Sequence, residues 1–350
     1  MESGLSFSAA DLAQTRFAVS PMWEVVTSFR LLREPDDPPL HRRWAAQVRP
    51  RVTGAGLDRG WLAELIPGHG YLADFLNPTP ATPFPTLAAE LDAIRASTPA
   101  QVRRDLDILH AKDAKDARDA KDARGAKGPG VGHRLSPRLR LLYEAPEQVL
   151  EKVVAEIEAY WELALAPYWA RIRQLLEADV FHRARQVAEH GSARVLSELH
   201  ETVRWDDGTL HLVRRHCALT RDKAGSGLLL VPSAFAWPRV LTRAVAPEPP
   251  QLAYPARGIG NLWAPRTSAA ADAVAAVLGR SRTLLLTELD TPASTTQLAA
   301  HCGLSAAAVS QHLTALRGAG LVTAHRSGRS VLYARTSVAD TLLSPTEELV

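Results

Sequence analysis

Residues 298–336 read LAAHCGLSAAAVSQHLTALRGAGLVTAHRSGRSVLYART, and this stretch predicts two helices joined by a tight turn and followed by a hairpin. The first helix is expected over 295–301. Gly303 follows its end, where a left-handed backbone costs a glycine least. Ser305 is a good N-cap for a second helix over 306–318, because its hydroxyl can accept a backbone amide hydrogen. The pattern therefore predicts a helix-turn-helix.

The second helix has two different faces. The inner face has the spacing of a buried stripe and comprises Val309, His312, Leu313 and Leu316, of which the histidine is read as a packing residue. The outer face is small and polar and comprises Ala307, Ser310, Gln311 and Thr314. A helix that enters a DNA major groove needs small side chains for close approach and a few polar groups to read base edges, such as Gln on adenine. The outer face is predicted to read duplex DNA.

The segment after the second helix predicts a basic hairpin. Short alternating strands are expected over 321–324 and 331–334, and the tip between them carries Arg326 and Arg329. Such arginines would contact phosphates without reading sequence. Residues 266–336 hold seven Arg against three acidic residues, a net charge of 7 − 3 = +4. The DNA-contacting residues predicted from the sequence are Ser305, Ala307, Ser310, Gln311, Thr314, Arg317, Arg326 and Arg329.

The pattern VSxHLxxLRxAGLV, which starts at Val309, resembles the winged-helix repressors of the ArsR/SmtB family. The resemblance covers residues 269–343 and includes 278–282, which is similar to the start of the family's second helix. It implies a sequence-specific transcriptional regulator, a repressor, that acts as a homodimer on an inverted-repeat operator. The family dimerises largely through its terminal helices, which places two recognition helices about one DNA turn apart.

Many members of that family sense metals through a Cys-x-Cys pair, and this chain has Ser294 and Thr296 at the corresponding positions. Only Cys217 and Cys302 are present, whereas a soft-metal sensor needs clustered thiolates. The spacing of His200, His211, His216 and Cys217 fits no standard ligand set. We therefore expect no metal and no cofactor. The alternative is a protein-interaction or dimerisation scaffold whose winged helix binds proteins, and a metal-responsive repressor is weaker than that alternative.

Composition places the chain among globular proteins of the cytoplasm. Its 350 residues are 46% hydrophobic, which is enough for a core in each of two or three domains. No apolar run approaches 18 residues, and residues 1–20 lack a basic region followed by a hydrophobic one, so no membrane partner is expected. Two cysteines fit a reducing compartment. We predict a regulatory or dimerisation domain over 1–255, a linker over 256–267 and a winged helix over 268–345.

The N-terminal domain is predicted to be helical with a small antiparallel sheet, so the fold class is mainly α with small antiparallel β. Helices are expected to start at Ser8 and at Ser20-Pro21, and Pro167 should kink a long helical stretch over 145–191 or split it in two. Residues 111–134 form a charged, low-complexity insertion. Short strands are expected over 194–199, 202–205, 208–213, 227–231 and 251–254.

Two interpretations of the N-terminal domain remain open. The aromatic pairs Tyr160/Trp161 and Tyr168/Trp169 could line a pocket for a small-molecule effector, or they could be core. The first 250 residues are similar to the helical domain that precedes ArsR-type winged helices in actinobacterial regulators, on the basis of Arg16-Phe17, Ser20-Pro21, Tyr254 and Gly258. No Gly-x-Ser-x-Gly, His-Glu-x-x-His, Walker or Rossmann pattern occurs, so the protein is not expected to be an enzyme.

Overall fold

A computed structural model describes residues 3–34, 38–122, 135–206, 208–212, 226–263, 269–290, 292–327 and 330–343. The chain forms two compact units. Unit 1 contains Met1–Asp36, Thr53–Glu158 and Ala178–Ala256, and unit 2 contains Asp37–Val52, Ala159–Glu177 and Arg257–Val350. None of the described helices is both long and apolar enough to cross a bilayer. The fold is mainly α with small sheets, as predicted.

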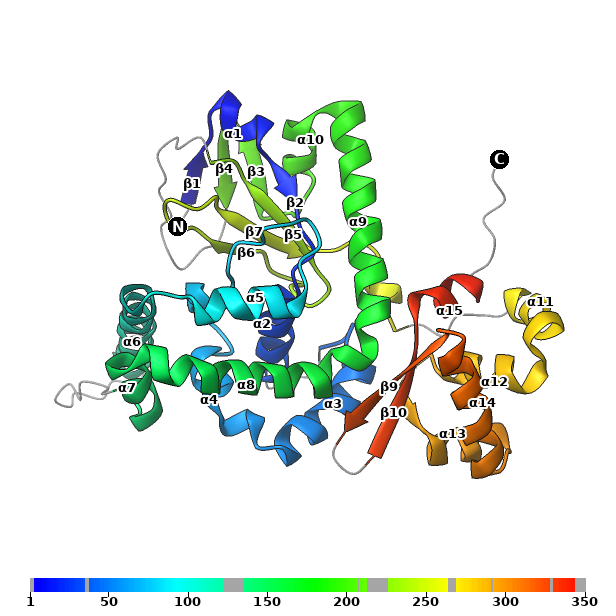
Figure 1. The fold of residues 1–350 in the computed structure, drawn as a ribbon. Helices are drawn as coiled ribbons and strands as arrows, with labels where there is room; N and C mark the ends of the chain where they lie inside the picture. Colours follow the sequence, from blue (N-terminus) through cyan, green and yellow to red (C-terminus); the bar gives the residue numbers. More distant parts are fainter. Residues whose placement is uncertain are drawn as a thin grey trace. The chain divides into compact units, whose positions relative to one another are not determined.

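Unit 1 contains two sheets (Figure 1). One is antiparallel, in the order β1-β4-β3, with bounds Ser3–Ser6, Thr209–Leu212 and Val203–Asp206. The other has the order β2-β5-β7-β6, with bounds Arg16–Phe17, Leu229–Ser233, Gln251–Pro255 and Leu241–Arg243. In this second sheet β5 pairs in parallel with both β2 and β7, and only β6 is antiparallel to its neighbour. All five residues of β5 are buried, as expected for a central parallel strand.

The helices before the winged helix follow the sequence signals closely. Their bounds are α1 Ala9–Ala13, α2 Pro21–Leu32, α3 Arg42–Gly54, α4 Trp61–Leu65, α5 Leu87–Arg95, α6 Pro99–Asp122, α7 Pro137–Glu144, α8 Pro146–Ala164, α9 Trp169–His190 and α10 Ser192–Ser197. Short 3-10 turns are η1 Leu57–Arg59, η2 Asp74–Leu76, η3 Ala166–Tyr168 and η4 Ile259–Asn261. Ser8 and Ser20 cap α1 and α2 as predicted, and the split at Pro167 is confirmed by η3 between α8 and α9.

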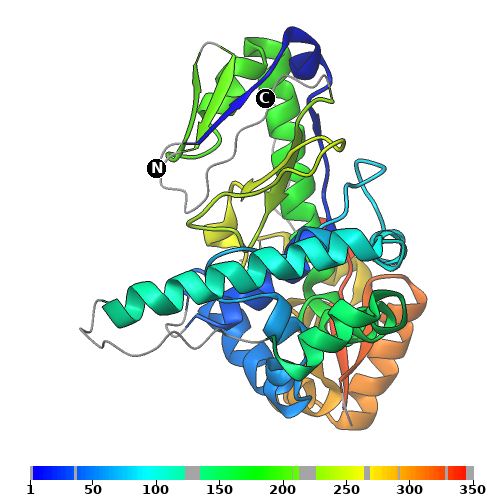
Figure 2. The ribbon, with the colours of Figure 1, turned by 90° about the vertical axis from the view of Figure 1, so that its left-hand side faces the viewer.

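One expectation needs correction, and some elements were not foreseen. Residues 194–199 lie mostly in α10 and not in a strand, because Gly191 (φ 80°) ends α9 and the chain then turns back into a helix that buries Val195 and Leu196. Residues 111–122 continue α6, which Figure 2 shows as one long helix, and 123–134 lie outside the described residues. Strands β1, β2, β6 and β8 were not predicted.

The aromatic pairs that could have lined a pocket are packed together. Tyr160, Trp161 and Tyr168 are buried, and the ring centroids of Trp161 and Trp169 lie 4.9 Å apart. Edge-to-face packing at this distance is typical of a protein interior. These side chains therefore contribute core packing to unit 2.

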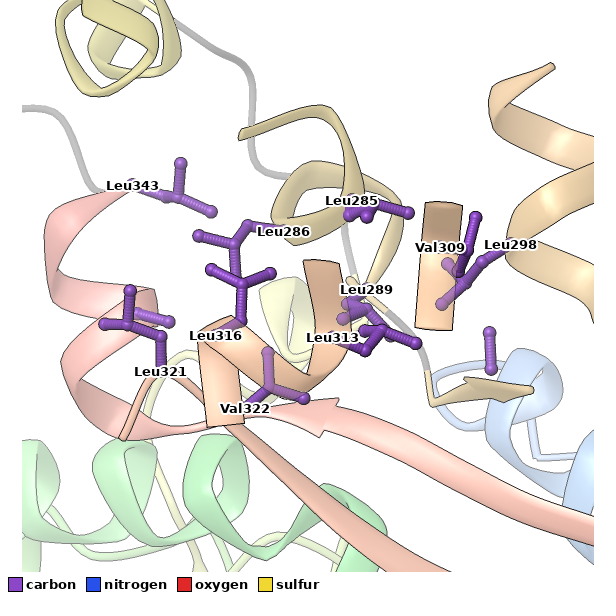
Figure 3. Packing of buried hydrophobic residues seen from close by; sticks show 12 residues of the cluster. Leu285, Leu286, Leu289, Leu298, Val309, Leu313, Leu316, Leu321, Val322 and Leu343 are labelled. Atoms are coloured by element: carbon purple, nitrogen blue, oxygen red, sulfur yellow. The ribbon is translucent and has the colours of Figure 1, made fainter. Parts of the chain in front are cut away.

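The winged helix lies in unit 2, and its helix-turn-helix and hairpin follow in the predicted order. Its bounds are α11 Ala269–Leu278, α12 Arg280–Glu288, β8 Ala293–Ser294, α13 Thr295–Cys302, α14 Ala306–Gly318, β9 Val322–Ser327, β10 Ser330–Arg335 and α15 Ser337–Leu342. The sheet order is β8-β10-β9, all antiparallel. Figure 3 shows the leucine and valine side chains of α12, α13, α14 and β9 pointing toward one another.

Helix α2 is buried along its whole length and carries an acid in its first turn. The Glu24 carboxyl group accepts the Ala234 amide hydrogen, with 3.1 Å between Oε2 and the nitrogen. Burial raises the pKa of Glu24 to about 8, although hydrogen bonds from Ser233 and Ala234 oppose this effect. The folded protein therefore holds this group as a neutral acid near pH 7.

Replacing Glu24 by Gln should reduce the loss of stability at alkaline pH. A carboxyl group whose pKa is raised in the folded state stabilises most below its unfolded pKa of 4.5, and this contribution is lost as the pH rises through 8. Gln has the shape of the protonated acid, so calorimetry between pH 5 and pH 9 should show a smaller fall in Tm for Glu24→Gln than for wild type. The exposed Glu158→Gln should behave like wild type. Parallel pH profiles for Glu24→Gln and wild type would contradict this assignment.

Candidate nucleic-acid interface

Three residues set the geometry of the two helices. Ser294 forms a capping box at the start of α13: its hydroxyl accepts the Gln297 amide hydrogen at 3.3 Å, and its own amide donates to Gln297 Oε1 at 2.9 Å. Gly303 ends this helix with φ 65°, a left-handed conformation that favours glycine. Ser305 then caps α14 by accepting the Ala308 amide hydrogen at 3.2 Å. The predicted turn is confirmed.

The inner stripe of α14 fixes which face of the helix is exposed. Val309, Leu313 and Leu316 are buried in the core of the winged helix, and His312 is half-buried at its border. The predicted contact residues on this helix are all exposed, namely Ser305, Ala307, Ser310, Gln311, Thr314 and Arg317. The Thr314 hydroxyl donates to the Ser310 carbonyl at 2.9 Å, so it offers a methyl group and an acceptor outward. Ser305 keeps its hydroxyl proton as a donor.

The hairpin places Arg326 on β9, exposed and opposite Val331. Arg329 lies outside the described residues. Arg335 is one of the seven arginines in residues 266–336, but its side chain is buried. Its Nε lies 3.1 Å from Asp340 Oδ1, and its Nη1 donates to the Leu286 carbonyl at 3.2 Å. Arg335 therefore holds β10 against α12 and α15 and adds no charge to the exposed surface.

The winged helix rests on helices from earlier in the chain, which the sequence did not indicate. Asp290, just after α12, makes two such contacts. Arg43 lies 3.3 Å from its carboxylate, and the buried Arg171 donates to its main-chain carbonyl at 3.0 Å. Strands β9 and β10 both contact η3. Because these contacts join segments far apart in the sequence, no local signal could have revealed them.

The positions considered for metal binding have other roles. Ser294 is the cap of α13, and Cys302 is half-buried against the winged-helix core, where burial and the nearby Glu288 raise the pKa of its thiol. Cys217 and His216 lie outside the described residues. Among the residues that are described, no three His, Cys, Asp or Glu side chains come together as metal ligands.

Comparisons with known proteins divide the chain in two. A model described as a family of unknown function, DUF5937, matches residues 1–260. The chain belongs to the DUF5937 family. C-terminal to the DUF5937 region, residues 283–324 match the model described as bacterial regulatory protein, arsR family. This second match covers the helix-turn-helix and the start of the hairpin, and it identifies them as an ArsR-type module of bacterial regulators.

Curated relatives of this DUF5937 chain support the same module. The chain is 60% identical over 38 residues to the HTH-type transcriptional regulator CmtR of Mycobacterium bovis and of Mycobacterium tuberculosis. The alignment covers 11% of this chain and 32% of each relative, so the matched segment spans about a third of their length. No solved structure matches the chain. The similarity therefore concerns the helix-turn-helix and not the DUF5937 region.

Strand β9 contains a histidine, His325, whose protonation should destabilise unit 2. His325 Nε2 lies 2.9 Å from Thr323 Oγ1, and Nδ1 lies 4.0 Å from the Glu162 carboxylate. Burial lowers the pKa of His325, and Glu162 opposes this only in part. A histidine with a lowered folded pKa contributes stability fully above its unfolded pKa of about 6.5 and loses it as the pH falls below that value.

We expect His325→Gln to remove part of the acid sensitivity of unit 2. Calorimetry of the full chain at pH 7.5 and pH 5.5 should show a smaller decrease in Tm for the variant than for wild type. For a domain of this size, a change of about 1 kcal/mol in the free energy of unfolding shifts Tm by roughly 2–4 °C. The exposed His301→Gln, on α13, serves as control and should not differ from wild type. An unchanged pH response in His325→Gln would be evidence against the burial effect.

Proposed function

We propose that this protein is a sequence-specific transcriptional regulator that binds duplex DNA through α14 and the β9–β10 hairpin. The observation that carries the proposal is the outer face of α14, which is small, polar and exposed, and the hairpin that follows it presents an exposed arginine, Arg326. A protein-binding surface of this size would present apolar anchors instead. The match to the arsR family supports the same function.

Each side chain has a distinct role in the proposed complex. Gln311 and Ser310 read base edges, and Ala307 and Thr314 allow the helix to approach the groove. Arg326 and Arg317 hold phosphates, as does Arg329 at the hairpin tip. The DUF5937 region supplies the regulatory input, and the winged helix blocks transcription from its operator. No catalytic role is proposed for any residue.

Selection from a library of random 30-bp duplexes tests the function directly. The full chain should enrich an inverted repeat whose half-sites lie about 10 bp apart, since a two-fold dimer places its recognition helices in successive major grooves. A chain without its winged helix is unsuitable as a control, because removal exposes the surface that it covers. A full chain that retains no duplex at low salt would overturn the proposal and favour a protein-interaction scaffold.

Two substitutions should separate base reading from phosphate binding. Gln311→Ala should relax preference at one base pair, because a bidentate contact contributes about 1–3 kcal/mol of discrimination. Arg326→Ala should weaken binding to all sequences alike and reduce the slope of log K against log salt by about 0.9 for each phosphate that is no longer bound. Fluorescence anisotropy on the enriched duplex and on a scrambled duplex measures both. Identical effects of the two variants would refute the assigned roles.

We also propose that the protein acts as a homodimer through the terminal helices of the winged helix. On α15, Val338 and Leu342 are 57% and 45% exposed and lie one helical turn apart. On α11, Val277 is 84% exposed. Exposed apolar side chains on both terminal helices are consistent with the dimerisation mode that the resemblance implies.

The double variant Val338→Lys/Leu342→Lys should be monomeric in analytical ultracentrifugation and should bind the enriched duplex more weakly. A charge at these positions would have to be buried in the interface without a partner. Phe181→Lys, at an apolar side chain of α9 that is 74% exposed, is the matched control and should leave both properties unchanged. A double variant that sediments as wild type would exclude this interface.

A further inference from the structure

Helix α3 is unusually basic for a segment of the N-terminal region. It reads RRWAAQVRPRVTG and contains Arg42, Arg43, Arg49 and Arg51 without any acidic residue. It lies within the DUF5937 match and outside the arsR match, so the resemblance to winged-helix regulators gives it no role. A helix with four arginines and no acidic residue of its own is an electrostatic feature that attracts phosphate-rich partners.

One side of α3 anchors it to unit 2. Trp44, Ala45, Val48 and Val52 are buried. The Trp44 indole donates to the Ala164 carbonyl at 2.9 Å, and Gln47 Oε1 accepts from the Tyr168 hydroxyl at 2.8 Å. The helix is therefore held by specific polar contacts as well as by apolar packing.

These contacts attach α3 to η3, the segment that the hairpin also contacts. Tyr168 belongs to η3, which both β9 and β10 contact. Arg43 makes a second connection, to Asp290 at the end of α12. Within unit 2, α3 and the hairpin thus rest on the same short segment (α3, β9 and β10 in Figure 1).

The opposite side of α3 is open to solvent. Arg42, Ala46, Arg49 and Thr53 follow helical spacing and share this side, and none of them is buried. Arg42 is exposed, and the structure shows no ion-pair partner for it among the described residues. On this side only Ala46 lies between the two arginines, so no bulky side chain separates them.

We propose that α3 is a second DNA-binding element, which contacts phosphates of the duplex beyond those that the hairpin reaches. The proposal rests on the proposed function. DNA is the partner that this surface fits, because α3 and the hairpin both contact η3 and because arginines bind the phosphates of a nucleic-acid backbone. The DUF5937 region thereby adds affinity without reading sequence.

Duplex length provides the test. The enriched duplex is used in two forms: trimmed to the shortest length that still responds to Gln311→Ala, and extended by ten base pairs at each end. Wild type should bind the extended form more tightly and with a steeper salt dependence. The double variant Arg42→Ala/Arg49→Ala should lose this gain, with a slope lower by about 0.9 for each phosphate that it no longer binds, and should match wild type on the trimmed form.

Two further variants serve as controls. Arg42→Lys keeps the charge and should retain most of the gain. Arg104→Ala removes an exposed arginine from α6 in unit 1 and should behave like wild type on both duplexes. Thermal unfolding of each variant should match wild type, since the substituted side chains are not in the core.

The outcomes separate this proposal from the proposed function. If the double variant keeps the wild-type slope on the extended duplex while Gln311→Ala still alters sequence preference, α3 does not bind DNA but the regulator assignment stands. If wild type binds neither duplex, both proposals fail. Polyglutamate and scrambled duplex are also compared as competitors of the extended duplex for binding to wild type. If the two compete equally well, and if the double variant is insensitive to both competitors, α3 is a site for acidic polypeptides and the DNA proposal is overturned.

Discussion

The burial of one side of α14 is the constraint on which the C-terminal surface depends. Val309, Leu313 and Leu316 fill the core between α12, α13 and β9, and this packing leaves the helix only one orientation. The polar side chains on the other side therefore point outward together. Specificity in such a surface comes from a few polar atoms, but their direction is fixed by apolar contacts on the far side of the same helix.

The parts of the fold that the sequence predicted depend on local signals. Ser294, Gly303 and Ser305 mark helix ends through interactions within a few residues, so the helix-turn-helix could be placed almost to the residue. The parallel pairing of β2 with β5 could not be predicted, since β2 has two residues and its partner lies more than 200 positions away. The strand predicted over 194–199 is wrong because a run of six is too short to separate strand from helical spacing.

In the candidate site, too, local sequence patterns predicted some features, whereas others depend on residues elsewhere in the chain. Exposure of the polar side of α14 followed from periodicity, whereas the burial of Arg335 depends on Asp340 and on a carbonyl of α12. The sequence also predicts a domain boundary near residue 255, and that boundary stays a prediction. The compact unit that holds the winged helix includes residues 37–52 and 159–177, so two segments of the DUF5937 region belong to the same compact unit as the ArsR-type module.

The buried pair Arg335–Asp340 has a consequence for how this module can evolve. Both side chains are almost fully shielded from solvent, at 4% and 2% exposure. Losing one partner leaves an isolated charge in the interior, which typically costs about 3–5 kcal/mol, whereas replacing both by apolar residues can be neutral. Sequence drift at these two positions should therefore proceed by paired replacement, and intermediates that carry only one of the two charges should be rare among functional descendants.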